Sequence, residues 1–171
     1  MNLQSEHLQI TRFTPAMAES VHLNSLDENN RKYVPDEVFE TKEVAEKVLK
    51  SLISFYEIDG KPKVYAIVLN NGQQIGHVQA APMRNGWEIG YHIGEKYTGK
   101  GYATEAVKLF LPFILDKLNI SEIVGICHAS NMASRTVMEK CGFTLVHEKY
   151  GLYQWKIKKI RKYKYVKHDI F

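Results

Sequence analysis

The sequence predicts a mixed α/β fold, with about four helices flanking one sheet of about six to seven strands. Segments whose apolar residues follow helical spacing alternate with shorter segments in which apolar residues recur at every second position. Three of the shorter segments follow one another and are separated by Asn-Gly dipeptides, which are typical of hairpin turns. The length of 171 residues, with 44% apolar and 25% charged residues, fits one globular domain over residues 1–171.

The N-terminal half is expected to hold a strand, two helices and a three-stranded antiparallel meander. Thr14-Pro15 and Thr41 are typical helix starts. The first helix should end near residue 26, and the second should stop at Asp59, Gly60 and Pro62. Residues 27–40 between them show no clear period and are expected to form a loop or a broken helix. The second helix should bury the face made by Val44, Val48, Leu52 and Phe55. The strands are expected at 7–13, 64–69, 74–81 and 87–93, with turns at Asn71-Gly72 and Asn85-Gly86.

The C-terminal half is expected to alternate helices and strands. A helix over 102–118 precedes a short buried strand over 123–127. A second helix over 131–140 should end at Gly142, because glycine adopts the left-handed conformation that closes a helix. Strands at 143–148 and 160–170 complete the sheet, and the tyrosine-rich connection between them has no clear prediction.

Composition limits the class of protein. No apolar run approaches the roughly 18 residues of a membrane helix, and the N-terminus lacks a secretory signal. Cys127 and Cys141 are too few for a disulfide framework and form no Cys-x-x-Cys pair. We therefore expect a soluble, cytoplasmic protein with reduced thiols, no membrane association and no metal. The histidines that show no metal-ligand spacing, and are assigned no site, are His7, His22, His77, His128, His147 and His168.

Positive charge is concentrated at the C-terminal end. Residues 155–171 contain seven Lys or Arg and one Asp, whereas residues 1–154 contain 16 bases and 18 acids. Lysines interleaved with Trp155, Tyr163 and Tyr165 are a composition that can bind nucleic acid. The pattern carries no recognised binding motif, so a twisted terminal strand whose lysines deter edge pairing is favoured.

The segment from Gly94 to Glu105 carries the strongest chemical signal. Its glycines leave a strand and enter a helix whose first N–H groups lack partners, and such a turn attracts phosphate. Gly94, Gly99 and Lys100 fit a nucleoside-triphosphate loop, but Gly101 stands where that loop needs a Mg²⁺-binding hydroxyl. A dinucleotide-binding loop would need a third glycine and a parallel βαβ unit. Taken alone, the segment is equally explained as a turn without a ligand.

A second segment, about thirty residues later, points to a family. It reads Asn131-Met-Ala-Ser134-Arg-Thr-Val-Met-Glu-Lys-Cys-Gly-Phe143. Together with Lys96-Tyr-Thr-Gly-Lys-Gly101, it resembles the GNAT N-acetyltransferase superfamily, in particular its ribosomal-protein-alanine N-acetyltransferase branch. The family loop begins with Gln or Arg, so Lys96 is a departure that keeps a donor but changes its geometry. The tail after Glu148 matches no motif.

The resemblance implies a GNAT-like, mostly antiparallel sheet and acetyl-CoA as cosubstrate, without a metal. In the family, backbone N–H groups of the loop hold the pyrophosphate, and an N–H near Ile93 faces the oxyanion where the sheet splays. Asn131 would contact the pantetheine arm, and it also fits a helix N-cap. The implied coenzyme-binding residues are Ile93, Lys96, Tyr97, Thr98, Gly99, Lys100, Gly101, Tyr102, Ala103 and Asn131.

Direct acetyl transfer to an amine needs a base for the ammonium and a donor for the departing thiolate. Glu88 is the preferred base, because it opens a stretch that resembles the family's fourth strand and Gly90 would leave space beside it. The alternative for Glu88 is a solvated charge next to a turn. His92 shares its strand face and is the second candidate. Met138 stands where many GNAT enzymes have a tyrosine acid, so the resemblance assigns thiolate protonation to Ser134.

The acceptor is expected to be a primary amine. The branch favours a protein N-terminal α-amine, and a polyamine, an amino acid or an aminoglycoside is the alternative. A CoA-binding sensor without catalysis would also be consistent with Met138. Meandering sheets with a free edge often dimerise, so a homodimer is a further expectation. The residues expected on the acceptor side are Asp27, Glu28, Arg31 and Tyr33.

Overall fold

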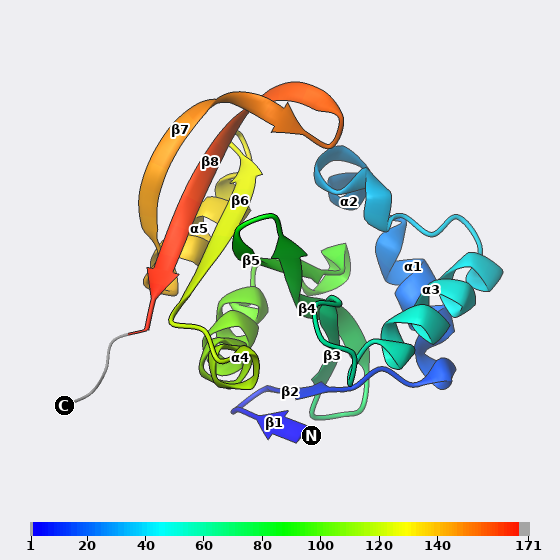
Figure 1. The fold of residues 1–171 in the computed structure, drawn as a ribbon. Helices are drawn as coiled ribbons and strands as arrows, with labels where there is room; N and C mark the ends of the chain where they lie inside the picture. The colour runs from blue at the N-terminus through cyan, green and yellow to red at the C-terminus, as the bar shows by residue number, and fades with distance from the viewer. Residues whose placement is uncertain (1, 168–171) are drawn as a thin grey trace.

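The computed structural model describes residues 2–167, which form one eight-stranded sheet with five α-helices (Figure 1). The strand order is β1-β2-β3-β4-β5-β6-β8-β7, and every neighbouring pair is antiparallel except β5 and β6. The predicted fold class is confirmed. The strands are β1 (Asn2–Gln4), β2 (Leu8–Thr11), β3 (Lys63–Leu69), β4 (Gln74–Met83), β5 (Gly86–Ile93), β6 (Glu122–His128), β7 (Thr144–Tyr153) and β8 (Lys156–Val166).

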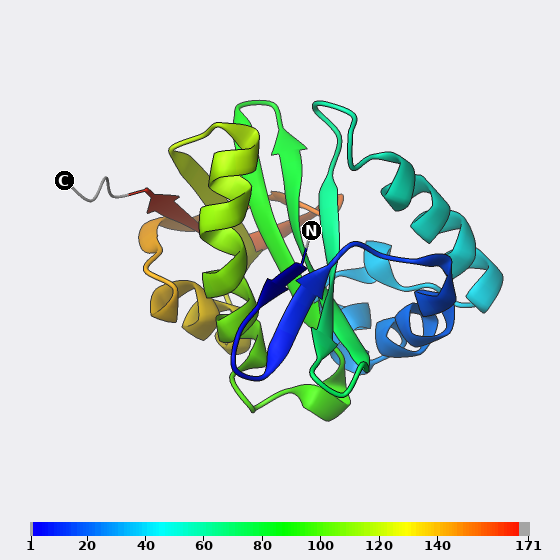
Figure 2. The ribbon, with the colours of Figure 1, turned by 90° about the horizontal axis from the view of Figure 1, so that it is seen from below.

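Helices cover both faces of the central strands (Figure 2). Leu49 of α3 packs with Ala66 of β3 on one face, whereas Phe110 of α4 packs with Tyr65 on the other. No described helix is long and apolar enough to cross a bilayer. The helices are α1 (Ala18–Ser25), α2 (Glu28–Tyr33), α3 (Lys42–Ser54), α4 (Tyr102–Leu118) and α5 (Met132–Lys140), with 3-10 turns η1 (Pro15–Met17), η2 (Pro35–Glu37) and η3 (Glu95–Tyr97).

Two short elements differ in how far they were predicted: β1 was not predicted, whereas α2 and η2 form the broken helix that was one of two alternatives for residues 27–40. Strand β1 is three residues long and α2 is six, and neither carries the apolar periodicity that sequence patterns detect. Helix α2 begins at an N-cap instead, because the side chain of Asp27 accepts a hydrogen bond from the N–H of Asn30 at 2.7 Å.

Two local predictions were wrong. The buried face of α3 contains Ala45 and Leu49, one position away from the predicted face, and Val44 is 42% exposed. The turn between β3 and β4 is longer than two residues, and only Gly72 in it has a left-handed φ, of 89°.

The C-terminal strands extend further than expected and form a long hairpin, which Figure 1 shows arching over the central strands toward α2. Pairing runs from Thr144 with Lys164 to Tyr153 with Lys156, so most of the tyrosine-rich segment, for which there was no clear prediction, belongs to the two strands. The tail forms the last strand of the chain, as predicted, but the prediction that its lysines protect a sheet edge was wrong, because β8 lies between β6 and β7 and β7 is the edge. The last part of the expected strand, with His168, lies outside the described residues.

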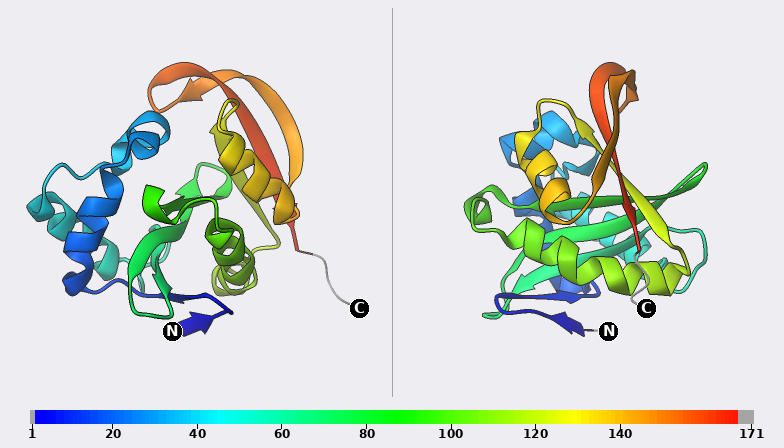
Figure 3. Two further views of the ribbon diagram at one scale, coloured as in Figure 1. Left: turned by 180° about the vertical axis from the view of Figure 1, so that it is seen from behind. Right: turned by 90° about the vertical axis from the view of Figure 1, so that its left-hand side faces the viewer.

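The sheet opens between β5 and β6. Within residues 2–167 these parallel strands pair at one register position, Glu88 with Val124, and diverge beyond it (Figure 3). The adjacent ladder explains what faces the opening. The N–H of Gly94 bonds to the carbonyl of Ile75, so in the alternating antiparallel pattern the N–H groups of Tyr91 and Ile93 point away from β4, toward the opening.

Candidate active site

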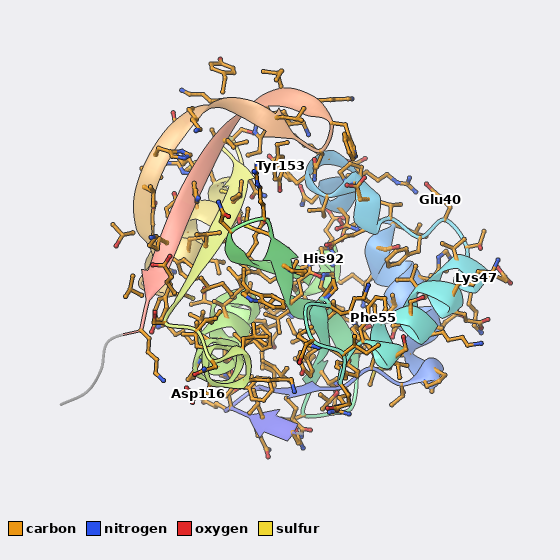
Figure 4. The ribbon with its side chains drawn as sticks, in the orientation of Figure 1. Glu40, Lys47, Phe55, His92, Asp116 and Tyr153 are labelled. Atoms are coloured by element: carbon orange, nitrogen blue, oxygen red, sulfur yellow. The ribbon has the colours of Figure 1, made fainter. Side chains whose placement is uncertain are left out.

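A cavity of about 590 Å³ occupies this opening. Strands β5 and β6 form its floor, and α2, α5 and the end of β7 form its walls. Figure 4 shows His92 on the central strands and Tyr153 above it, on the hairpin. Of the described residues, the cavity lining includes no lysine or arginine, so a cation on this surface meets a negative potential. The carboxylates of the lining belong to Asp27, Asp36, Glu37, Glu88 and Glu95.

The glycine loop lies at the end of β5, before α4. Gly99 and Gly101 have φ values of 75° and 83°, which L side chains rarely adopt, and a Cβ at either would meet no protein atom within 4 Å. The backbone N–H groups from Gly99 to Thr104 donate no hydrogen bond to another described residue. Free N–H groups at a helix start bind anions, so the loop fits a pyrophosphate.

Some of the residues expected to bind coenzyme line the cavity, and the others lie outside it. Ile93, Thr98, Ala103 and Asn131 line the cavity. Lys96, Gly99, Lys100 and Gly101 are exposed outside it, whereas the rings of Tyr97 and Tyr102 pack against the core. The N–H of Tyr102 is free, whereas the N–H groups of Tyr97 and Thr98 already donate to the carbonyls of Gly94 and Glu95, so the expectation that these two N–H groups hold a pyrophosphate was wrong.

Glu88 lies on β5 at the last position where β5 and β6 pair. Burial raises the pKa of its carboxyl to about 7, with the nearby carboxylate of Glu37 adding to the rise. No other described residue donates a hydrogen bond to this carboxyl group. Gly90 does not leave open space beside it, because a Cβ there would lie 2.7 Å from Nε2 of Gln79.

His92, the second candidate base, is engaged by Asp27. Its Nε2 lies 3.1 Å from Oδ2 of Asp27, and the two side chains are 12% and 9% exposed. The same carboxylate accepts a hydrogen bond from the N–H of Glu95 at 3.3 Å. Burial opposes the charge on Asp27, but these hydrogen bonds lower its pKa below the usual value. Asp27 therefore links α2 to the start of the glycine loop. Of the two candidate bases, Glu88 is the one whose side chain forms no hydrogen bond with another described residue.

A second, partly buried pair lies next to the first. Oε2 of Glu37 is 3.1 Å from Nε2 of His77, and Oε1 accepts a hydrogen bond from Gln79 at 3.0 Å. Burial acts to raise the pKa of Glu37, but His77 and His92 hold it below its usual value. The sequence did not predict this pair. Glu37 lies in a segment without periodicity, and only the tertiary structure brings His77 of β4 beside it.

Ser134 and Tyr91 form a pair of hydroxyl groups on the α5 side of the cavity. The hydroxyl of Tyr91 lies 2.9 Å from Oγ of Ser134 and 3.0 Å from its carbonyl oxygen. Asn131 caps α5 by accepting a hydrogen bond from the N–H of Ser134 at 3.1 Å. Met138 is 2% exposed and packs against Gly125, where a side chain would collide with its methyl group. Tyr91 is a residue that the sequence analysis did not assign to the site.

The acceptor end contains only part of the expected set. Asp27 and Tyr33 line the cavity, whereas Glu28 is exposed away from it and Arg31 pairs with Glu40 outside it. Three further residues line this end: His128, Tyr153 and Gln154. Gln154 donates a hydrogen bond to the carbonyl of Tyr33, which joins the hairpin tip to α2. His128 ends a buried strand, as Ile93 does, and that position is the signal that could have identified it.

Comparison with known proteins agrees with this geometry. The sequence matches the acetyltransferase (GNAT) domain over residues 7–144. YnaD of Bacillus subtilis (strain 168), an uncharacterized N-acetyltransferase, is 29% identical over 144 residues, or 83% of this chain and 82% of YnaD. A GNAT-family acetyltransferase from Bacillus anthracis superposes with a TM-score of 0.83 at 25% identity, covering 97% of this chain and 98% of that one.

The fold is also shared with the ribosomal-protein-S5-alanine acetyltransferase from Vibrio fischeri. Its TM-score is 0.80 at 18% identity, over 99% of this chain and 98% of that one, and this likeness shows the fold alone. The domain match covers most of the chain and includes both the glycine loop and the Asn131 helix start. The chain belongs to the GNAT family of acetyl-CoA-dependent N-acetyltransferases.

Proposed function

We propose that the enzyme transfers acetyl from acetyl-CoA directly to a primary amine, with Glu88 as the general base. The observation that carries this proposal is the position of Glu88, a buried carboxyl with a pKa of about 7 on the floor of a cavity rich in carboxylates. A base with a pKa near neutrality can take a proton from an ammonium ion and release it again at physiological pH. The carboxylates around it attract the acceptor as a cation.

The coenzyme end of the proposed site consists of main-chain donors. The N–H groups from Gly99 to Thr104 would hold the pyrophosphate, with Lys96 and Lys100 adding positive charge. The N–H of Ile93, which points into the opening, would face the oxyanion. Asn131, whose Oδ1 is occupied by the cap, keeps its amide hydrogens for the pantetheine arm.

Among primary amines we favour the N-terminal α-amine of a protein. The fold relative from Vibrio fischeri is an acetyltransferase of a ribosomal-protein alanine, which supports this choice. The row of carboxylates would also suit a small amine with several positive charges, so this second acceptor class belongs in the same test. We propose one acetyltransferase domain over the whole chain.

Thiol release from acetyl-CoA tests the proposal, measured with peptides that begin with Ala or Ser and with a panel of polyamines, amino acids and aminoglycosides. We expect release with one class and a kcat/KM that rises with pH through about 7 as Glu88 ionises. The variant Glu88→Gln should lose this rise of kcat/KM with pH, whereas any pH dependence that comes from ionisation of the acceptor amine should remain. Tight binding of acetyl-CoA, with no thiol released in the presence of any of these amines, would instead identify a sensor and overturn the proposal.

A further inference from the structure

The leaving sulfur needs a hydrogen-bond donor that Met138 cannot provide. A thioether has no hydrogen to donate, and this side chain is buried in the core against Gly125. Any donor must therefore come from another residue that lines the cavity.

Tyr91 brings a hydroxyl from β5 to the first turn of α5. Its oxygen is 2.9 Å from Oγ of Ser134 and 3.0 Å from the carbonyl oxygen of the same residue. The phenol has one hydrogen, so it can donate to only one of these acceptors at a time. When Tyr91 donates to Oγ, the hydroxyl hydrogen of Ser134 can point either into the cavity or to Sγ of Cys127, with which this hydroxyl also interacts.

The surroundings keep Tyr91 a neutral donor. Burial raises the pKa of its phenol far above the usual value. The titratable groups that face it are Cys127 from β6, Cys141 after α5 and Tyr163 from β8. Burial also raises the pKa of Cys127, and that of Cys141 to about 11, so no anion forms beside Tyr91 near neutral pH.

Ser134 is held in place from two sides. Asn131 binds its N–H at 3.1 Å, and Tyr91 binds its hydroxyl. Both Ser134 and Tyr91 line the cavity, and the backbone of Tyr91 belongs to the same strand as Ile93. A ligand sulfur between Ile93 and α5 would therefore meet the hydroxyl of Ser134.

We propose that Tyr91 is a positioning residue for acetyl transfer, which orients the hydroxyl of Ser134 toward the sulfur of the coenzyme. The inference rests on the proposed direct transfer in this cavity. Ser134 then donates to the sulfur in place of a tyrosine at position 138, and Tyr91 on β5 only orients that hydroxyl.

The step balances without an additional reagent. The amine nitrogen forms a bond to the acetyl carbon after Glu88 takes one ammonium proton, and the carbon–sulfur bond breaks with its electron pair on sulfur. Ser134 donates its hydroxyl hydrogen bond to that sulfur, while Tyr91 turns its hydrogen from the carbonyl of Ser134 to Oγ. Neither hydroxyl loses its proton; the nitrogen loses its second proton to water, and the thiolate is protonated by water as it leaves.

Calorimetric binding of CoA and desulfo-CoA between pH 6.5 and 9 tests the inference without turnover. The ratio of the two affinities reports the contribution of the sulfur alone, because other titrating groups of the protein affect the binding of both ligands equally. In the wild-type enzyme we expect CoA to gain about tenfold over desulfo-CoA as pH rises, the effect of one charge-assisted hydrogen bond on a thiolate. Tyr91→Phe and Ser134→Ala should each flatten this rise while desulfo-CoA binds as before.

Tyr153→Phe is the matched control, because it removes a hydroxyl from the same cavity at the acceptor end. It should keep the wild-type pH dependence. An unchanged rise in Tyr91→Phe, a flat ratio in the wild-type enzyme, or equal loss of both ligands in Tyr91→Phe would overturn the role of Tyr91. Failure of the wild-type enzyme to bind either ligand would instead refute the coenzyme site and with it the proposed function.

Discussion

The two ends of the cavity are built on different principles. At the coenzyme end, consecutive N–H groups from Gly99 to Thr104 form the proposed anion site, and the two glycines set its shape. At the acceptor end, side chains from segments far apart in the sequence meet, with Glu37 touching His77 and Asp27 touching His92. The first end depends on backbone conformation and the second on tertiary packing.

This difference determines how each end responds to substitution. A main-chain site tolerates changes of side chain except where a residue must have a left-handed φ. In a side-chain site, the pKa of each carboxyl depends on both its burial and the charges of its neighbours. One substitution therefore shifts the pKa values of the other carboxyls. Three substitutions test this distinction.

The largest effect is expected at the acceptor end, for Glu88→Gln. Loss of the general base should lower kcat by about a thousandfold. The folded protein should nevertheless become more stable at pH 8, by on the order of 2 kcal/mol, because it no longer carries a buried charge. Since the folded pKa of Glu88 is raised from 4.5 to about 7, the wild-type penalty develops as pH rises through this window and is absent below it.

Steady-state kinetics and urea unfolding at pH 4 and pH 8 measure the two effects. Glu28→Gln is the control, because Glu28 is exposed outside the cavity and should change neither quantity. Equal stability of Glu88→Gln and wild-type protein at pH 8 would show that the carboxyl is solvated in solution.

At the coenzyme end, Gly101→Val should reduce CoA affinity by about a hundredfold or more and leave the fold intact. Its φ of 83° strains a branched residue by about 1–2 kcal/mol, and the added side chain would occupy the space in front of the free N–H groups. Gly72→Val is matched to it, with a φ of 89° and open space in the β3–β4 turn. Calorimetry should show affinity lost in the first variant alone; equal loss in both would attribute the effect to destabilisation.

The smallest effect is expected for Glu37→Gln, which removes the like charge near Glu88 and keeps the shape of the side chain. The pKa of Glu88 should fall, so the rising limb of the pH–rate profile moves to lower pH. We expect about threefold higher kcat/KM at pH 6 and little change at pH 8. Asp36→Asn, in the same turn and cavity, should leave the limb in place. A limb that moves equally in both variants would indicate a general effect of charge.

The sequence predicted best what is encoded locally. Helix α4 has the predicted bounds, and the cap at Asn131 and the left-handed Gly142 lie where the pattern placed them. For residues 27–40 the sequence left a loop and a broken helix open, and it could not place α2, because this helix depends on the cap of Asp27 and on tertiary contacts rather than on an apolar face.

The acceptor end could not be predicted for a related reason. Strand alternation placed Tyr91 opposite Glu88, but the divergence of β5 from β6 opens the sheet and lets both line one cavity. Tyr153 reaches that cavity through a hairpin whose turn, Gln154-Trp155, has left-handed φ values of 51° and 61° in residues that do not signal a turn.

The divergence of β5 and β6 also bears on aggregation. Beyond Glu88 the backbone of β5 is an unpaired rim in the middle of the sheet, and such rims usually recruit strands from other molecules. Here α2, α5 and the hairpin form the walls of the cavity in front of it and so cover these unpaired groups. A ligand with its own amide groups could form hydrogen bonds with the unpaired backbone groups of β5. The hydrogen bonding of this strand would then be complete only while the ligand is bound.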